Sequence, residues 1–262
     1  MSEQRSMEIE VALDATAEQV WDAIATGPGI SAWFVPTAVE PGRIRQDFGS
    51  GYVVDGQVTA CEPGTRFAYG RAPDAEPTQE GPDYAFEFLV EARDGGSTVL
   101  RFVQSGFADT EGWEAEYDSF RHGWTLFFLN LAAYLEHFAG RPVHNVVAMG
   151  FTALDRDEAW TVIHDALGLT KPPQVGDEVR LTPDGPAAIS GVVDVATREF
   201  LGVRTAGGLY RFGAEGTDGC GVSAYHYLFD TGEVVEPALW TAWLSGLFPA
   251  PQAAEAGAAP AS

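Results

Sequence analysis

The sequence WEAEYDSFRHGWTLFFLNLAAYLEHF, from Trp113 to Phe138, decides the fold. It contains no proline, and its one interior glycine is Gly123. Its large apolar residues recur in alternating steps of three and four, which is the spacing of one helical face, at Trp113, Tyr117, Phe120, Trp124, Phe127, Leu131, Leu135 and Phe138. At 1.5 Å per residue such a helix would be roughly 39 Å long. Because aromatic side chains bury much area, this face is predicted to lie against a broad apolar surface.

The chain before this helix has the pattern of an antiparallel sheet. The clearest strand is 84–93, where Tyr84, Phe86, Phe88 and Val90 face one way, and Asp94-Gly95-Gly96 is predicted to form the following hairpin turn. Shorter strands are predicted at 7–13, 42–48, 52–62, 65–71 and 97–104. Sequential hairpins favour a meander with one packed face, so the strands and the long helix predict an α+β fold.

A helix is also predicted near the start of the chain. Thr16-Ala-Glu-Gln19 has the form of a capping box before an apolar-periodic run, which should stop at Gly27-Pro28-Gly29. The aromatic residues of the short turn at 30–34 are expected to hold this helix on the sheet.

The second half of the chain repeats this layout. A strand at 146–154 leads to Asp155-Arg-Asp-Glu158, which again has the capping-box form. Three residues follow the two caps at matching distances, in the pairs Trp21 and Trp160, Ile24 and Ile163, and Gly29 and Gly168. Further along, the stretch Gly56-Gln-Val-Thr-Ala resembles Gly191-Val-Val-Asp-Val, and Arg66-Phe67 is loosely repeated by Glu199-Phe200. The repetition indicates a duplicated domain.

The predicted domains are residues 7–140 and a shortened, degenerate second copy at 146–248 that lacks several strands. The second copy would end in a shorter helix at 235–248. The low-complexity stretch at 249–262 is expected to be a disordered tail.

The first unit resembles the START/Bet v 1-like (SRPBCC) superfamily, and within it the domains named after the activator of Hsp90 ATPase (AHSA1). The resemblance covers about residues 7–140, and the stretches that carry it are 10–24, 30–34, 56–70, 97–107, Gly123-Trp124, Leu131 and Tyr134-Leu135. It implies a helix-grip fold, in which an antiparallel sheet wraps around a long C-terminal helix and encloses an apolar cavity. Family members bind hydrophobic small molecules, act as polyketide cyclases or aromatases, or assist Hsp90. Many of them have a histidine before Ser-Gly at the end of the last strand, where this chain has Gln104.

Composition excludes several classes of partner. The chain of 262 residues carries a formal charge of −23, which disfavours binding to nucleic acid or to an anionic membrane surface. No apolar run approaches the ~18 residues that span a bilayer, and the N-terminus lacks a hydrophobic signal core, so a cytoplasmic location is expected. Cys61 and Cys220 lie in different halves and indicate neither a disulfide framework nor a zinc site.

No catalytic set stands out in the sequence. It has no phosphate-binding loop and no nucleophile elbow, and its five histidines form no metal-ligand spacing, so neither catalytic residues nor metal or cofactor sites are predicted. His122 and His226 are interpreted as an exposed helical residue and an ordinary strand residue. Arg101 is expected in an ion pair on the outer face of the sheet.

The predicted binding site is the aromatic space between the sheet and the long helix. Its lining residues would be Phe67, Tyr69, Phe86, Phe88, Phe102, Gln104, Tyr117, Phe120, Trp124, Phe127 and Leu131. Gln104 and Tyr69 are the polar groups that could orient a ligand there. The alternative is that these side chains form only core.

Three functions remain open at this point. The first is non-enzymatic binding of an apolar small molecule, and the second is a cyclase or aromatase, which requires an ionisable group inside the cavity. The third is a protein that works with an Hsp90-type chaperone, which the rate of the Hsp90 ATPase would test.

Overall fold

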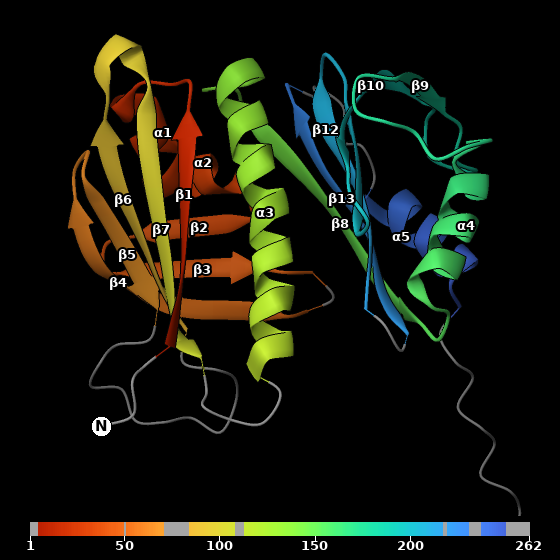
Figure 1. Ribbon diagram of the computed structural model, residues 1–262, viewed down its shortest axis with the longest axis horizontal. Helices are drawn as coiled ribbons and strands as arrows, with labels where there is room; N and C mark the ends of the chain where they lie inside the picture. Colours follow the sequence, from red (N-terminus) through yellow and green to blue (C-terminus); the bar gives the residue numbers. More distant parts are fainter. Residues whose placement is uncertain are drawn as a thin grey trace, which may run out of the picture.

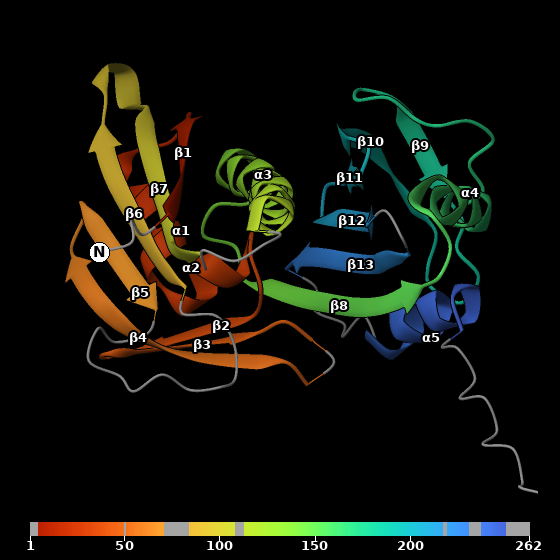
Figure 2. The same ribbon diagram turned by 60° about the horizontal axis from the view of Figure 1, so that its bottom comes forward.

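The structure, a computed structural model, describes residues 5–49, 51–70, 84–107, 113–216, 219–230 and 237–249. Two antiparallel sheets stand on either side of one long helix, α3 (Trp113–His137), as Figure 1 shows. Figure 2, turned by 60°, shows the same layers, with α4 (Arg156–Ala166) and α5 (Pro237–Leu247) on the far side of the second sheet. The helix that decides the fold is therefore shared by both halves of the chain.

Sheet 1 is the predicted meander, with the strand order β1-β7-β6-β5-β4-β3-β2. Its strands are β1 (Arg5–Leu13), β2 (Thr37–Glu40), β3 (Arg43–Asp47), β4 (Val53–Glu62), β5 (Arg66–Gly70), β6 (Ala85–Ala92) and β7 (Thr98–Phe107). The first strand begins two residues earlier than predicted, and β2 was not predicted because only four residues form it. A 3-10 turn at Asp94–Gly96 joins β6 to β7, where Gly95 adopts a φ of 81°.

Two short helices follow β1. In α1 (Ala17–Ala25) the capping box is complete, since Thr16 Oγ1 accepts from the Gln19 N–H and Gln19 Oε1 accepts from the Thr16 N–H. The glycine-proline stretch ends α1 as predicted, but it also begins α2 (Gly27–Ser31), because proline fits the first turn of a helix. A Cβ at Gly29 would lie 2.0 Å from the Asp22 carbonyl oxygen, so only glycine permits this close approach.

Sheet 2 has the strand order β8-β13-β12-β11-β10-β9. Its strands are β8 (Val143–Thr152), β9 (Glu178–Leu181), β10 (Ile189–Ala196), β11 (Phe200–Arg204), β12 (Gly208–Glu215) and β13 (Cys220–Phe229). As in sheet 1, the first strand precedes a helix, the last strand pairs with the first, and a closing helix follows. Relative to sheet 1 it lacks only the counterpart of β2, so the expected loss of several strands was wrong.

The strand registers show which residues occupy equivalent positions in the two sheets. Met7 pairs with Gln104 in sheet 1, and Val146 pairs with His226 in sheet 2. Met7 and Val146 each lie nine residues before the capping residue of the next helix, Thr16 or Asp155. His226 therefore occupies the position in the second copy that Gln104 occupies in the first.

A bulge repeats in the same place. The β4–β5 register shifts between Val58 and Ala60, and the β10–β11 register shifts between Val193 and Val195. Since Val58 pairs with Tyr69 and Val193 with Val203, Tyr69 corresponds to Val203. The predicted match of Arg66-Phe67 to Glu199-Phe200 is therefore displaced by one residue, and the true counterpart is Phe200-Leu201.

Helix α3 is buried on two faces, whereas the sequence pattern predicted one apolar stripe. Trp124, Phe128 and Leu131 belong to the core under sheet 1. On the opposite side, Leu126 packs with Val195 and Phe200 of sheet 2. The stretch 124–135 is apolar almost all round, which is typical of a helix covered on both sides.

Some predictions fall outside the described residues. They concern the end of the strand predicted at 65–71, the start of the helix predicted at 235–248 and all but Pro249 of the tail at 249–262.

Candidate functional site

The eleven predicted lining residues come together in one place. They lie on β5, β6, β7 and α3, and all the apolar ones belong to, or pack against, the core of the first domain. The centre is Trp124, whose ring centroid lies 4.2 Å from that of Phe102 and 5.8 Å from that of Phe86. Phe67 lies further out and contacts Trp21 of α1 at 6.4 Å. The sequence pattern therefore identified a real aromatic cluster, here named the grip cluster.

Gln104 is the most unusual polar group of this cluster. Its side chain is fully buried, and its Oε1 accepts a hydrogen bond of 2.6 Å from Trp124 Nε1. Among the residues that the structure describes, its Nε2 has no hydrogen-bond partner. A buried N–H donor without an acceptor lowers the stability of the fold by about 1–3 kcal/mol. The Gln104 amide could therefore still donate a hydrogen bond to an acceptor.

Tyr69, the second predicted polar group, is also buried rather than reaching the surface. Its hydroxyl accepts a hydrogen bond of 3.2 Å from Gln46 Nε2. Burial raises the pKa of Tyr69 well above its ordinary value, and the bond from Gln46 opposes this only in part. The phenol is therefore neutral at physiological pH.

Ionisable acids and bases are missing from the buried part of this cluster. Among the described residues of the first domain, the buried polar side chains are Ser31, Gln46, Thr98, Gln104 and Asn130. None of these titrates near neutral pH.

The rings of the grip cluster contact one another between the sheet and the helix. Phe34 stacks on Trp124 at 5.1 Å, and Trp33 stacks on Phe128 at 6.0 Å. Hollows lie elsewhere on the molecule. One of about 340 Å³ lies beside β9, lined in part by Lys171 and Arg180, and another of about 100 Å³ lies beside β2 and β3. A ligand between sheet 1 and α3 would have to displace aromatic rings.

Sequence reasoning missed four members of the cluster. Trp33 and Phe34 were expected to hold α1 on the sheet, but they reach across to α3. Phe128 lies outside the stripe that was used to find the helix. Ile44, Gln46 and Phe48 are every second residue, so their side chains point to the same face. This shared face was the signal that could have identified Gln46.

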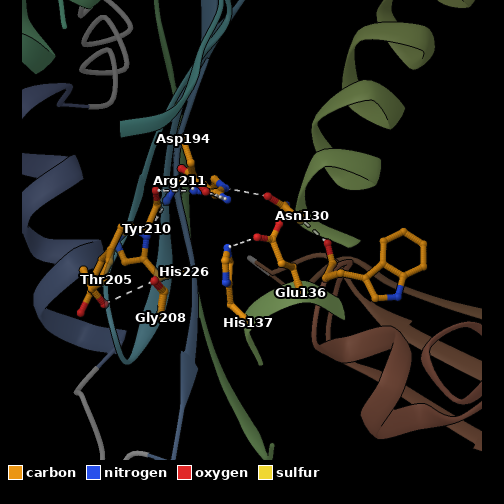
Figure 3. Close-up of polar contacts among 10 residues, drawn as sticks. Asn130, Glu136, His137, Asp194, Thr205, Gly208, Tyr210, Arg211 and His226 are labelled. Carbon is orange, nitrogen blue, oxygen red and sulfur yellow. Dashed lines mark hydrogen bonds and ion pairs between the residues drawn. The ribbon is translucent and has the colours of Figure 1, made fainter. Parts of the chain in front are cut away.

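The second domain joins α3 through a buried ion pair, shown in Figure 3. Arg211, which is 1% exposed, donates two hydrogen bonds of 2.8 Å to the two carboxylate oxygens of Asp194. Its Nε donates a bond of 2.6 Å to Asn130 Oδ1 on α3, and Asn130 Nδ2 in turn donates to the Trp33 carbonyl oxygen. A Cβ at Gly202 would lie 2.6 Å from Arg211 Nη1, so glycine leaves room for this pair.

Arg101 forms an ion pair on the surface of sheet 1. The predicted outer-face pair of Arg101 is confirmed, since its Nε and Nη2 donate to Glu8 at 2.6 and 2.8 Å. His122 is exposed, as interpreted, whereas His226 is fully buried and is not an ordinary strand residue.

An acidic pair lies at the end of sheet 2. Glu199 forms an ion pair of 3.0 Å with Arg156, and both side chains are largely buried. Burial, together with repulsion by Glu199, raises the pKa of Glu215 to about 7. Glu215 is therefore about half ionised at neutral pH.

Replacing Glu215 with glutamine is expected to stabilise the protein above neutral pH. The raised pKa favours folding fully below pH 4.5, the ordinary value, and this contribution is lost as the pH rises through about 7. Glu215→Gln should therefore raise the free energy of unfolding by about 1–2 kcal/mol at pH 8 relative to its effect at pH 4.5. Urea unfolding at both pH values measures this, with the exposed Glu178→Gln as control. Equal effects of Glu215→Gln at the two pH values would contradict the assignment.

Comparison with known proteins gives one family match. Residues 14–136 match the model of the family described as Activator of Hsp90 ATPase homolog 1-like protein. No curated protein matches the chain. Among the described residues, no helix is both long and apolar enough to cross a membrane.

Several solved structures are similar to parts or most of the chain. Protein MLL2253 from Mesorhizobium loti is 25% identical, with a TM-score of 0.44, and the alignment covers 51% of this chain and 98% of that one. The di-domain ARO/CYC protein BexL of the BE-7585A biosynthetic pathway is 14% identical over 93% of each chain, with a TM-score of 0.43. DynU16 of the dynemicin biosynthetic locus is 19% identical over 90% of this chain and 92% of that one, with a TM-score of 0.43.

The family match covers α1, strands β2 to β7 of sheet 1 and nearly all of α3, and it begins just after β1. These are the elements that build the grip cluster, and the resemblance found in the sequence is thereby confirmed. Residues 14–136, a little under half of the chain, are therefore similar to the domains of the Activator of Hsp90 ATPase homolog 1-like family.

Proposed function

We propose that the first domain binds an apolar small molecule carrying an acceptor oxygen, between sheet 1 and α3. One observation supports this above all others: Gln104 Nε2 is a fully buried donor without a partner, at the centre of an aromatic cluster. Apolar walls with very few polar groups are typical of small-molecule sites. A carbonyl or ether oxygen of a ligand would satisfy the free amide hydrogen.

Trp124 would be the side chain that a ligand displaces. It covers Gln104, and its indole contacts rings from both β6 and β7. Displacing it would release Gln104 Oε1 as well as expose Nε2, so the site would then offer both a donor and an acceptor. The aromatic rings around it would form the apolar walls.

Binding without catalysis agrees best with the chemistry of the cluster. A cyclase needs a group that moves protons near neutral pH. The buried polar groups described here are amides, hydroxyls and a phenol whose pKa is raised, and Gln104 stands where many family members have histidine. The cyclase and the chaperone-linked function both lack a supporting observation within the described residues.

The proposal is tested with a matched pair of probes, 2-acetonaphthone and 2-ethylnaphthalene, which differ in one acceptor oxygen. The first domain should bind the ketone more tightly than the hydrocarbon. Gln104→Leu should weaken ketone binding about tenfold, since one hydrogen bond is worth up to 1.5 kcal/mol, and should leave hydrocarbon binding unchanged. Titration calorimetry measures both affinities.

The control variant is Gln57→Leu, which changes an exposed glutamine on β4 and should leave both affinities unchanged. If Gln104→Leu binds the ketone as tightly as the unmodified protein does, the proposed site is wrong.

A further inference from the structure

The second domain has a polar group buried in the same place as Gln104. The register of sheet 2 sets His226 at the equivalent position, opposite Val146 on one side and Tyr210 on the other. In sheet 1, Gln104 is set between Met7 and Phe86 in the same manner. Both side chains are 0% exposed.

The closing helix also contributes a tryptophan in both domains. Trp124 of α3 lies over Gln104, and Trp240 of α5 lies against His226 with ring centroids 4.3 Å apart and an interplanar angle of 80°. Phe212 and Tyr210 complete the surroundings of the imidazole, at 5.2 and 5.0 Å. The duplicated fold has therefore kept a polar residue beside an indole in an aromatic environment.

The hydrogen bond that His226 Nδ1 accepts assigns its tautomer. Its Nδ1 accepts from the backbone N–H of Arg211 at 3.2 Å, as Figure 3 shows, so the ring hydrogen of the neutral imidazole is on Nε2. Within the described part of the chain, Nε2 has no hydrogen-bond partner. Burial lowers the pKa of His226 to about 3, so the ring stays neutral and Nε2 remains a donor at physiological pH.

The two domains thus share one chemical feature. Five buried side-chain atoms of the described residues have no hydrogen-bond partner, namely Gln104 Nε2, His226 Nε2, His144 Nε2, Arg156 Nε and the Tyr227 hydroxyl. Of these, Gln104 Nε2 and His226 Nε2 occupy equivalent positions on the last strands of the two sheets, and both side chains contact the tryptophan of the closing helix. Core polar groups are ordinarily paired, and an apolar side chain would avoid the cost at either position. The recurrence at equivalent positions points to a common use of these donors.

We propose that the interior of the second domain, between sheet 2 and α5, is a second binding site for an apolar molecule, whose acceptor oxygen takes the hydrogen bond of His226 Nε2. The inference rests on the proposed function of the first domain for the class of ligand. It adds that one chain binds two such molecules. The neutral imidazole acts as a hydrogen-bond donor and not as a base.

The test counts ketone molecules on the full chain by native mass spectrometry with 2-acetonaphthone. Two should bind. His226→Phe should remove one of them, and His226→Gln should keep both, because glutamine supplies a buried donor at this position as Gln104 does in the first domain. Gln104→Leu should remove the other ketone. His226→Gln also shows that a change at this position leaves the fold intact.

A second readout follows the imidazole itself. In protein labelled with ¹⁵N-histidine, the ring nitrogens of His226 should show the Nε2–H tautomer, and the Nε2 proton should move downfield on adding the ketone but not on adding 2-ethylnaphthalene. The missing signal in His226→Phe identifies the residue.

The possible outcomes separate the two proposals. One ketone per chain, lost in Gln104→Leu and kept in His226→Phe, would overturn the second site and leave the first. One ketone lost only in His226→Phe would support the second site and contradict the first. An Nε2 proton that responds equally to ketone and hydrocarbon, or the absence of any bound ketone, would overturn the inference.

Discussion

Arg211→Leu is expected to lower the free energy of unfolding by about 3–5 kcal/mol, because it leaves a buried carboxylate without its cation. Asp194 is only 17% exposed and loses both of its 2.8 Å hydrogen bonds. Asn130 on α3 loses the donor to its Oδ1 at the same time. The effect should therefore be felt by both domains, and urea unfolding followed by tryptophan fluorescence measures it.

A matched control is available on sheet 1. Arg101 also binds a carboxylate with two hydrogen bonds, but its side chain is 46% exposed and that of Glu8 is 48% exposed. Arg101→Leu should have a much smaller effect on stability than Arg211→Leu, since water replaces an exposed pair. Equal losses in Arg101→Leu and Arg211→Leu would show that burial of the Arg211 pair has no energetic importance.

The double variant Arg211→Leu with Asp194→Leu tests the reason for the loss. If the damage comes from an unpaired buried charge, removing that charge should recover a large part of the stability. A double variant less stable than Arg211→Leu alone would contradict this explanation.

Trp124→Ala is expected to destabilise the protein by about 3–5 kcal/mol, the usual cost of removing a large aromatic side chain from a core. Trp124 is 4% exposed. Its indole contacts Phe102 of sheet 1, Phe34 in the turn after α2 and Phe128 of α3. Its loss also leaves Gln104 Oε1 without the donor that now satisfies it. Thermal or urea unfolding reports the change.

Two controls accompany Trp124→Ala. Trp124→Phe keeps most of the apolar contact but removes the indole N–H, so it should cost less than the alanine variant. Tyr52→Ala removes an aromatic side chain that is 60% exposed and should change stability little. If Trp124→Ala and Tyr52→Ala have similar effects, the grip cluster is not the core of the first domain.

Local structure could be predicted from the sequence where a residue pattern is compatible with only one conformation. The capping boxes at Thr16 and Asp155 formed as predicted, since their side chains satisfy backbone groups within three residues. The aromatic face of the meander was also predictable, because side chains alternate strictly along a strand. These rules gave the grip cluster without knowledge of the second domain.

What could not be predicted depends on contacts between distant parts of the chain. The pattern of α3 predicted a single buried face, but Asn130 and Tyr134 contact Arg211 and Phe229 of sheet 2, which lie much later in the sequence. Asn130 is a polar residue in a nearly apolar run, and only its partner Arg211 explains it. His226 likewise became significant through the register of sheet 2, which a single sequence does not contain.

The position of α3 between two sheets has a consequence for the independence of the halves. A chain cut after Gly140 would leave Leu126, Tyr134 and Phe138 facing water, and a chain starting at Val143 would uncover Tyr227 and Phe229. Each half therefore shields apolar side chains of the other from water, so deletion of one half should yield an insoluble remnant rather than a smaller folded protein.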